Sequence, residues 1–134
     1  MFPSPFKLNL VLAWLWVLLG FLSGMLMGLK FHREDWLGGY ASHQRRLYRL
    51  GHISFFGLAI INLLFVFTFQ QFMNQHACNA VVRFASCAFA LGALTMPLCC
   101  AVAAHKKDAR GLFAVPVISL LVGGGCTLWE VIKL

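Results

Sequence analysis

Apolar positions along the chain gather into long uncharged stretches separated by short polar segments. These stretches are Leu8–Leu29, Ile53–Phe72, Phe84–Ala104 and Gly111–Trp129. A helix needs about 20 apolar residues to cross a hydrocarbon core about 30 Å thick. Because lipid offers the backbone no hydrogen-bond partners, a helix is the natural structure for each stretch. The pattern predicts an all-α integral membrane protein, folded as a four-helix bundle with short loops.

The composition agrees with this fold class. Apolar residues make up 60% of the chain and charged residues 11%, whereas about 25% of the residues in a soluble domain are charged. The longest segment between two stretches is Lys30–His52, which is too short for a separate soluble domain. We therefore expect a single transmembrane domain over residues 1–134.

The basic residues predict how the bundle is oriented. Eight of the eleven lie in two of the connecting segments: Lys30, Arg33, Arg45, Arg46, Arg49, Lys106, Lys107 and Arg110. The opposite side carries only Lys7, Arg83 and Lys133. The positive-inside rule places loops 30–52 and 105–110 in the cytoplasm and both termini outside, in a membrane of the bacterial inner type. The net charge of +7 then indicates contact with anionic lipids rather than with nucleic acid.

The first cytoplasmic loop has its own local signals. Gly38 and Gly39 form a turn signal, and Ser42 can cap a helix that begins after it. We expect a basic amphipathic turn or two that runs directly into the second span. Trp36 and Tyr40 are typical of the membrane interface.

Small residues recur at helical spacing within two of the spans. Gly20, Gly24 and Gly28 follow one another every four residues in the first span, and Ala88 and Gly92 do so in the third. Small residues at this spacing allow another helix to approach closely. Both sets are therefore predicted to be helix contacts.

Three polar residues in or beside the spans also predict contacts between helices. Asn62 lies in the middle of the second span, where an amide usually bonds to a neighbouring helix. Arg83 and Glu130 flank the third and fourth spans at their outer ends. Antiparallel neighbours bring such charges to a similar depth, which predicts an Arg83–Glu130 ion pair. The alternative is that each charge points separately into the head-group region.

Histidine placement gives the sharpest chemical signal. His32 closes the first span, His52 opens the second and His105 closes the third, so all three are expected at the cytoplasmic boundary. Neutral imidazole is a ready ligand for haem iron or a transition metal. The alternative is that these histidines are solvated residues at the membrane edge. The cysteines form no CxxC metal motif; they are Cys78, Cys87, Cys99, Cys100 and Cys126.

Three classes of function remain open. The absence of a catalytic set and the strips of small residues favour a non-catalytic scaffold or accessory subunit, packed against other membrane subunits. An energy-converting or electron-transfer complex is the host that we expect. The first alternative is a haem- or metal-binding electron-transfer protein that uses the boundary histidines. The second is an oligomeric channel or transporter. It lacks the usual acidic residue in the middle of the membrane.

The orientation generates the first prediction. A membrane-impermeant thiol reagent should label Cys78 in intact cells, because its loop faces outward. A cysteine introduced at Ser42 should react only after the membrane is permeabilised. Mass spectrometry of the labelled protein measures both sites. Labelling of the Ser42→Cys variant in intact cells would contradict the orientation.

Overall fold

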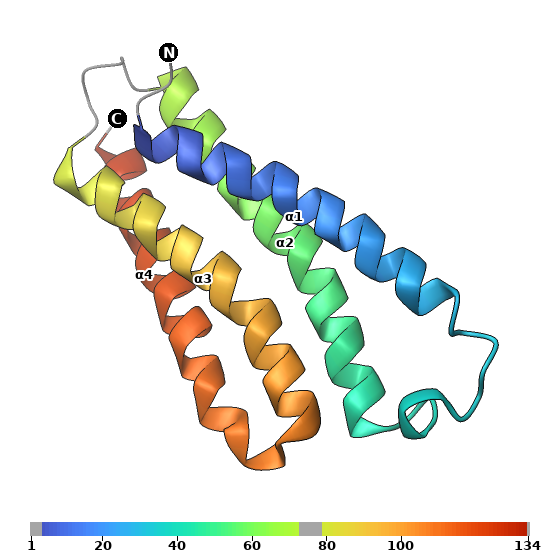
Figure 1. Cartoon of the computed structure of the whole chain (residues 1–134). Coiled ribbons are helices and arrows are strands. Elements are labelled where there is room, and N and C mark those ends of the chain that lie inside the picture. The colour runs from blue at the N-terminus through green and yellow to red at the C-terminus, as the bar shows by residue number, and fades with distance from the viewer. Residues whose placement is uncertain (1–3, 73–78, 134) are drawn as a thin grey trace.

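The computed structural model describes residues 4–72 and 79–133, and within them it is helical with no strand. Its long helices are α1 (Ser4–Gly28), α2 (His43–Phe72), α3 (Ala80–His105) and α4 (Ala114–Ile132) (Figure 1). Two short 3-10 helices, η1 (Trp36–Gly38) and η2 (Lys107–Phe113), lie in the connections. The four long helices are long and apolar enough to cross a membrane. The all-α, four-helix prediction is confirmed.

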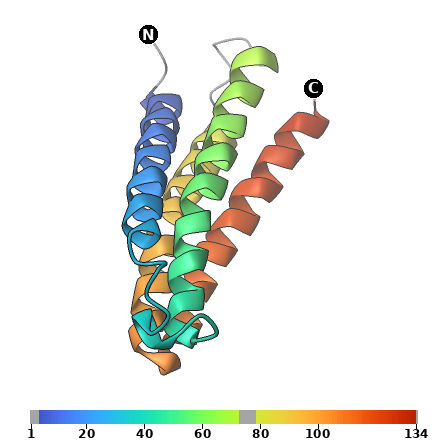
Figure 2. The same cartoon turned by 90° about the vertical axis from the view of Figure 1, so that its right-hand side faces the viewer.

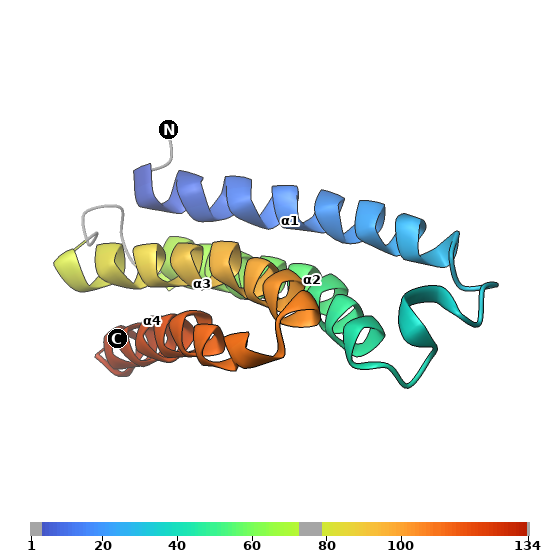
Figure 3. The ribbon, with the colours of Figure 1, turned by 60° about the horizontal axis from the view of Figure 1, so that its bottom comes forward.

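Successive helices run antiparallel, so the N-terminal end of α1 and the C-terminal end of α4 lie at the same end of the molecule (Figures 1 and 2). Helix α3 packs against each of the other three, and α1 and α2 also pack against each other. Helix α4 packs extensively only against α3. Figure 3 shows α1 and α4 on opposite sides of the α2–α3 pair. The bundle is therefore a three-helix unit with α4 attached to its flank.

Capping side chains set two of the helix starts. Ser42 Oγ accepts a hydrogen bond from the Arg45 backbone N–H at 3.1 Å, so α2 begins ten residues before the apolar stretch. This confirms the predicted basic extension. Asn79 accepts from Val82 N–H at 2.9 Å and starts α3 before Phe84. Each cap satisfies a helix N–H that otherwise has no partner. Cys78 lies outside the described residues.

Aromatic rings fill the core at the end of the bundle where α1 begins. Phe65 lies 6.0 Å from Phe6, 5.1 Å from Phe69 and 5.4 Å from Phe89 between ring centroids. These separations suit edge-to-face contact. Further along, small residues let α1 approach α3, and Trp16 Nε1 donates to the Ala93 carbonyl at 3.0 Å. Aromatic rings thus fill the space between the helices at one end, and α1 and α3 lie close together in the middle.

A buried polar cluster joins α1, α2 and α3. The Asn9 amide donates to Asn62 Oδ1 at 2.7 Å and to the Ser86 carbonyl at 3.3 Å. Ser86 Oγ donates back to Asn9 Oδ1, and Asn62 also donates to the Leu58 carbonyl at 2.8 Å. Asn62 therefore bonds to a neighbouring helix. Its partner Asn9 was not singled out from the sequence. We call Asn9, Asn62 and Ser86 the polar node.

The polar node generates the second prediction. Replacing Asn9 or Asn62 with Leu should lower the free energy of unfolding in detergent micelles, because each change leaves a buried amide without its partner. The double-mutant cycle should give a coupling of about 0.6–1.7 kcal/mol, as measured for hydrogen bonds between membrane helices.

The control is Thr95→Val. Thr95 Oγ1 donates to Leu91 O at 2.7 Å within its own helix, so its loss should not change the Asn9–Asn62 coupling. Strictly additive effects of the two asparagine substitutions would show that the node does not link the helices.

Candidate functional site

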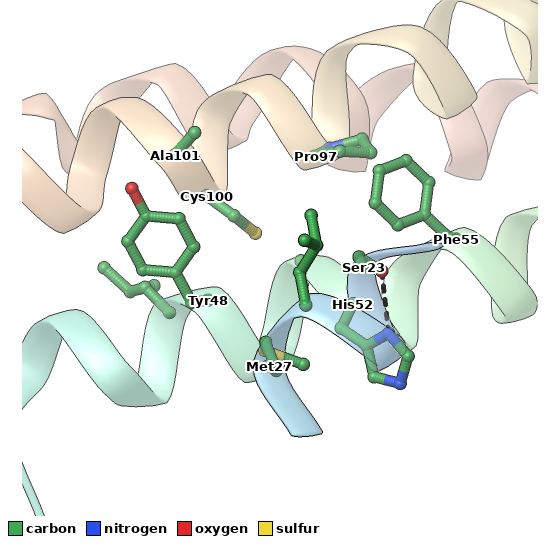
Figure 4. Close-up of a pocket in the computed structure, with 11 residues that line it drawn as sticks. Ser23, Met27, Tyr48, His52, Phe55, Pro97, Cys100 and Ala101 are labelled. Atoms are coloured by element: carbon green, nitrogen blue, oxygen red, sulfur yellow. Dashed lines mark hydrogen bonds between the residues drawn. The ribbon is translucent and has the colours of Figure 1, made fainter. Parts of the chain in front are cut away.

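A cavity of about 330 Å³ lies between α1, α2 and α3, toward the end at which α2 begins (Figure 4). Most of its lining is apolar, with hydroxyl, imidazole and thiol groups at the edge. The lining residues are Ser23, Leu26 and Met27 of α1; Leu47, Tyr48, Gly51, His52 and Phe55 of α2; and Pro97, Cys100 and Ala101 of α3. A cavity of this size and character suits a small apolar group.

The cavity exists because α1 and α2 separate after a tight contact. A Cβ atom added at Gly20 would lie 2.7 Å from the Phe56 ring, and one at Gly24 would lie 2.8 Å from His52 Cε1. At Gly28 a Cβ atom would meet nothing within 4 Å. Figure 1 shows the two helices diverging toward this end. Gly20 and Gly24 therefore lie against α2. In the described residues Gly28 lies against no other helix, because α1 and α2 have already separated there, so contact of Gly28 with a partner chain stays a prediction.

The small pair in α3 lies against α4 or in the core. A Cβ atom at Gly92 would meet Leu120 of α4 at 2.7 Å. Ala88 is buried. The absence of a side chain at Gly92 therefore lets α4 approach α3 closely.

His52 is held in one orientation by α1. Its Nδ1 lies 2.8 Å from Ser23 Oγ, and the Ser23 hydroxyl donates to the Gly20 carbonyl at 3.0 Å. A hydroxyl has one proton, so this network assigns the donated proton to His52 Nδ1. In the neutral ring, Nε2 then carries the lone pair. It is the nitrogen available for a donor or a metal.

The other two boundary histidines have different surroundings. His105 Nε2 lies 2.8 Å from the Tyr48 hydroxyl, and His32 is exposed. Within residues 4–72 and 79–133, no three or more His, Cys, Asp or Glu side chains form a group suited to a metal ion. The structure thus engages His52 with α1 and His105 with α2. Haem or metal binding by His32, His52 and His105 stays a prediction.

Glu130 does not pair with Arg83. Its buried carboxylate accepts from Asn79 Nδ2 at 2.9 Å and from Lys133 Nζ at 3.1 Å. Asn79 caps α3 beside the end of α4, and Lys133 follows Glu130 by about one turn. Both side chains are therefore close enough to donate to the Glu130 carboxylate. Arg83 lies one turn inside α3 and is exposed. The predicted Arg83–Glu130 ion pair is therefore wrong.

Arg45 has a role that the sequence did not reveal. Its side chain is only 4% exposed, and its guanidinium carbon lies 5.6 Å from the Phe31 ring centroid, 5.5 Å from Trp36 and 5.3 Å from Tyr40. Arg49 lies 4.5 Å from the same Tyr40 ring. We call Arg45 with Phe31, Trp36 and Tyr40 the arginine cage. The only sequence signal was the interleaving of aromatic and basic residues.

No protein-family model, curated protein or solved structure matches this chain. The function must therefore be argued from the geometry of the cavity, the arginine cage and the helix surfaces.

The tight seam generates the third prediction. Gly24→Leu should lower the free energy of unfolding by about 1–3 kcal/mol, because the new side chain must displace the His52 ring from a packed contact. Gly28→Leu is the matched control, and its effect should stay within about 0.5 kcal/mol, since the space beside it is open. Denaturant unfolding in micelles measures both. Equal effects of the two variants would contradict a tight seam at Gly24.

Proposed function

We propose that this chain is a small non-catalytic subunit that packs against a transmembrane helix of a different membrane protein. The contact surface is the groove between α4 and α2. The observation that carries this proposal is the one-sided packing of α4.

Helix α4 uses a narrow stripe to hold the bundle. Its buried residues are Pro116, Gly123 and Glu130, which are spaced seven residues apart. Residues at this spacing lie on one face of a helix, as in a seam between two helices. Large apolar side chains elsewhere on α4 are exposed, among them Ile118, Leu121 and Leu128. Most of the helix surface is left for lipid or for a partner.

The groove between α4 and α2 is shaped to receive a helix. It has a volume of about 460 Å³. Its walls and floor are Ile61, Leu64, Phe65 and Thr68 of α2, Phe89 of α3, and Gly124, Thr127, Leu128 and Val131 of α4. A Cβ atom at Gly124 would meet nothing within 4 Å. The backbone of α4 is therefore open to close approach from this side, which is how membrane helices associate.

The glycines favour a protein partner over lipid. Each glycine within a helix is less favourable than alanine by about 1 kcal/mol, and Gly123, Gly124 and Gly125 follow one another in the least packed helix. Of the three, Gly123 meets the Phe89 ring of α3. Lipid chains adapt to a larger side chain, whereas a packed helix does not. An open glycine in a groove therefore suits a helix contact.

The sequence favours an energy-converting or electron-transfer complex as the host. Support for this choice comes from the boundary histidines, because His52 retains an Nε2 without a hydrogen bond in the described residues. The visible absorption spectrum of the co-purified assembly tests it. An assembly without pigment would remove this choice of host and leave the subunit proposal intact.

The groove generates the fourth prediction. Gly124→Leu should reduce the amount of co-purifying partner about tenfold, which corresponds to about 1.4 kcal/mol of lost association. Gly125→Leu is the matched control, since it introduces the same side chain beside the groove and also meets open space. Quantitative mass spectrometry after gentle detergent extraction measures the partner.

A photo-crosslinking residue identifies what fills the groove. Placed at Leu128, which lines the groove, it should link to a different chain. Placed at Leu18 of α1, which has nearly the same exposure (60% against 59%), it should not. Crosslinks from position 128 only to lipid, or only to a second copy of this chain, would overturn the proposal.

A further inference from the structure

We infer that the arginine cage and the neighbouring cavity together bind one anionic phospholipid, with its phosphate at Arg45 and part of one acyl chain in the cavity. This site lies on the α1–α2 seam and does not depend on the partner proposed for α4.

The charge of Arg45 has no partner in the described residues. Its Nε is buried and has no hydrogen-bond partner in the described residues. In residues 4–72 and 79–133 the only ion pair is Lys133–Glu130, so neither Glu34 nor Asp35 of the same loop neutralises Arg45. A charge withdrawn from water is costly unless an opposite charge or hydrogen bonds compensate it. The structure of this loop therefore calls for an anion.

Three aromatic rings surround the guanidinium of Arg45. Aromatic rings attract the flat face of a guanidinium group, while its N–H donors point outward in the plane of the group. The rings of Phe31, Trp36 and Tyr40 lie within cation–π distance of Arg45. They surround the guanidinium, and its buried Nε has no acceptor in the described residues. Phosphate matches this fork with two parallel hydrogen bonds.

The arginine cage lies next to the cavity along the chain. Turns continue the chain past α1, with Phe31 N–H bonded to the Gly28 carbonyl at 3.2 Å, so Phe31 lies about one turn beyond Met27. On α2, Arg45 lies about one turn before Tyr48. Both Met27 and Tyr48 line the cavity. The cage therefore follows the cavity along one seam, on the side where the basic loop lies.

This order matches an amphiphile with a charged head and an apolar tail. The cavity is lined mainly by apolar side chains such as Met27, Phe55 and Pro97 (Figure 4). The head-group end carries Arg45 and Arg49, which share the Tyr40 ring. In the described residues neither arginine has a carboxylate partner. Two such cations favour an anionic lipid over a zwitterionic one.

Native mass spectrometry of the purified protein in neutral detergent tests the head-group contact. Dioleoyl phosphatidylglycerol should bind with a stoichiometry of one, and dioleoyl phosphatidylcholine should bind about tenfold more weakly or not at all. Arg45→Gln should weaken phosphatidylglycerol binding about tenfold. Arg46→Gln is the matched control, because it removes the same charge from an exposed neighbour and should leave the affinity unchanged.

A second pair of variants tests the cavity and does not depend on folding of the Arg45 variant. Ala101→Leu fills the cavity from an exposed position on its rim and should also weaken binding about tenfold. Ala114→Leu, exposed at the start of α4, should have no effect. Inorganic phosphate at the same concentration should not displace the lipid.

The inference would be overturned by equal affinity for the two lipids, by equal losses in Arg45→Gln and Arg46→Gln, or by displacement of phosphatidylglycerol by inorganic phosphate at matched concentration. Unchanged binding in Ala101→Leu would also overturn it, because an acyl chain in the cavity must compete with the added side chain.

Discussion

The polar node formed by Asn9, Asn62 and Ser86 fixes the register of three helices, and the other features of the bundle follow from that register. Lipid tails are as apolar as the helix surfaces, so burial of apolar groups gives membrane helices little reason to choose one alignment over another. Asn9 supplies that reason, because its amide reaches α2 and α3 at once. The aromatic core lies on one side of the node, and the seam that opens into the cavity lies on the other. A shift of α1 by one turn would lose both.

The attachment of α4 follows a different logic. Its buried stripe meets α3 where Gly92 and Gly123 remove side chains from the interface, and the ring of Phe89 fills the space at Gly123. At the C-terminal end of α4, Asn79 of α3 donates a hydrogen bond to the carboxylate of Glu130. These contacts hold one face of α4 against α3 and leave its other faces uncovered. The molecule thus combines a packed unit of α1, α2 and α3 with a fourth helix whose surface is mostly exposed.

The sequence predicted what depends on local pattern and missed what depends on the meeting of distant segments. Length and hydropathy located the spans, and Ser42 located the start of α2. Gly28 fits the small-residue pattern as well as Gly24 does, and only the divergence of the helices distinguishes them. The Arg83–Glu130 pair was wrong because a cap residue, Asn79, occupies the carboxylate. The cavity depends on where α1 and α2 separate, and the arginine cage depends on where the first loop places its aromatic rings beside Arg45, so no spacing of residues could predict either.

The helices differ in length, so they fit a bilayer of a given thickness differently. Helix α2 has 30 residues and is about 45 Å long, whereas α4 has 19 and is about 28 Å long. A hydrocarbon core about 30 Å thick leaves the excess of α2 to tilt or to extend into the head groups, whereas α4 alone falls slightly short and crosses it together with η2, over Lys107–Ile132. Helix α4 packs extensively only against α3, so contacts with a single helix limit the tilt of α4 in a membrane of different thickness.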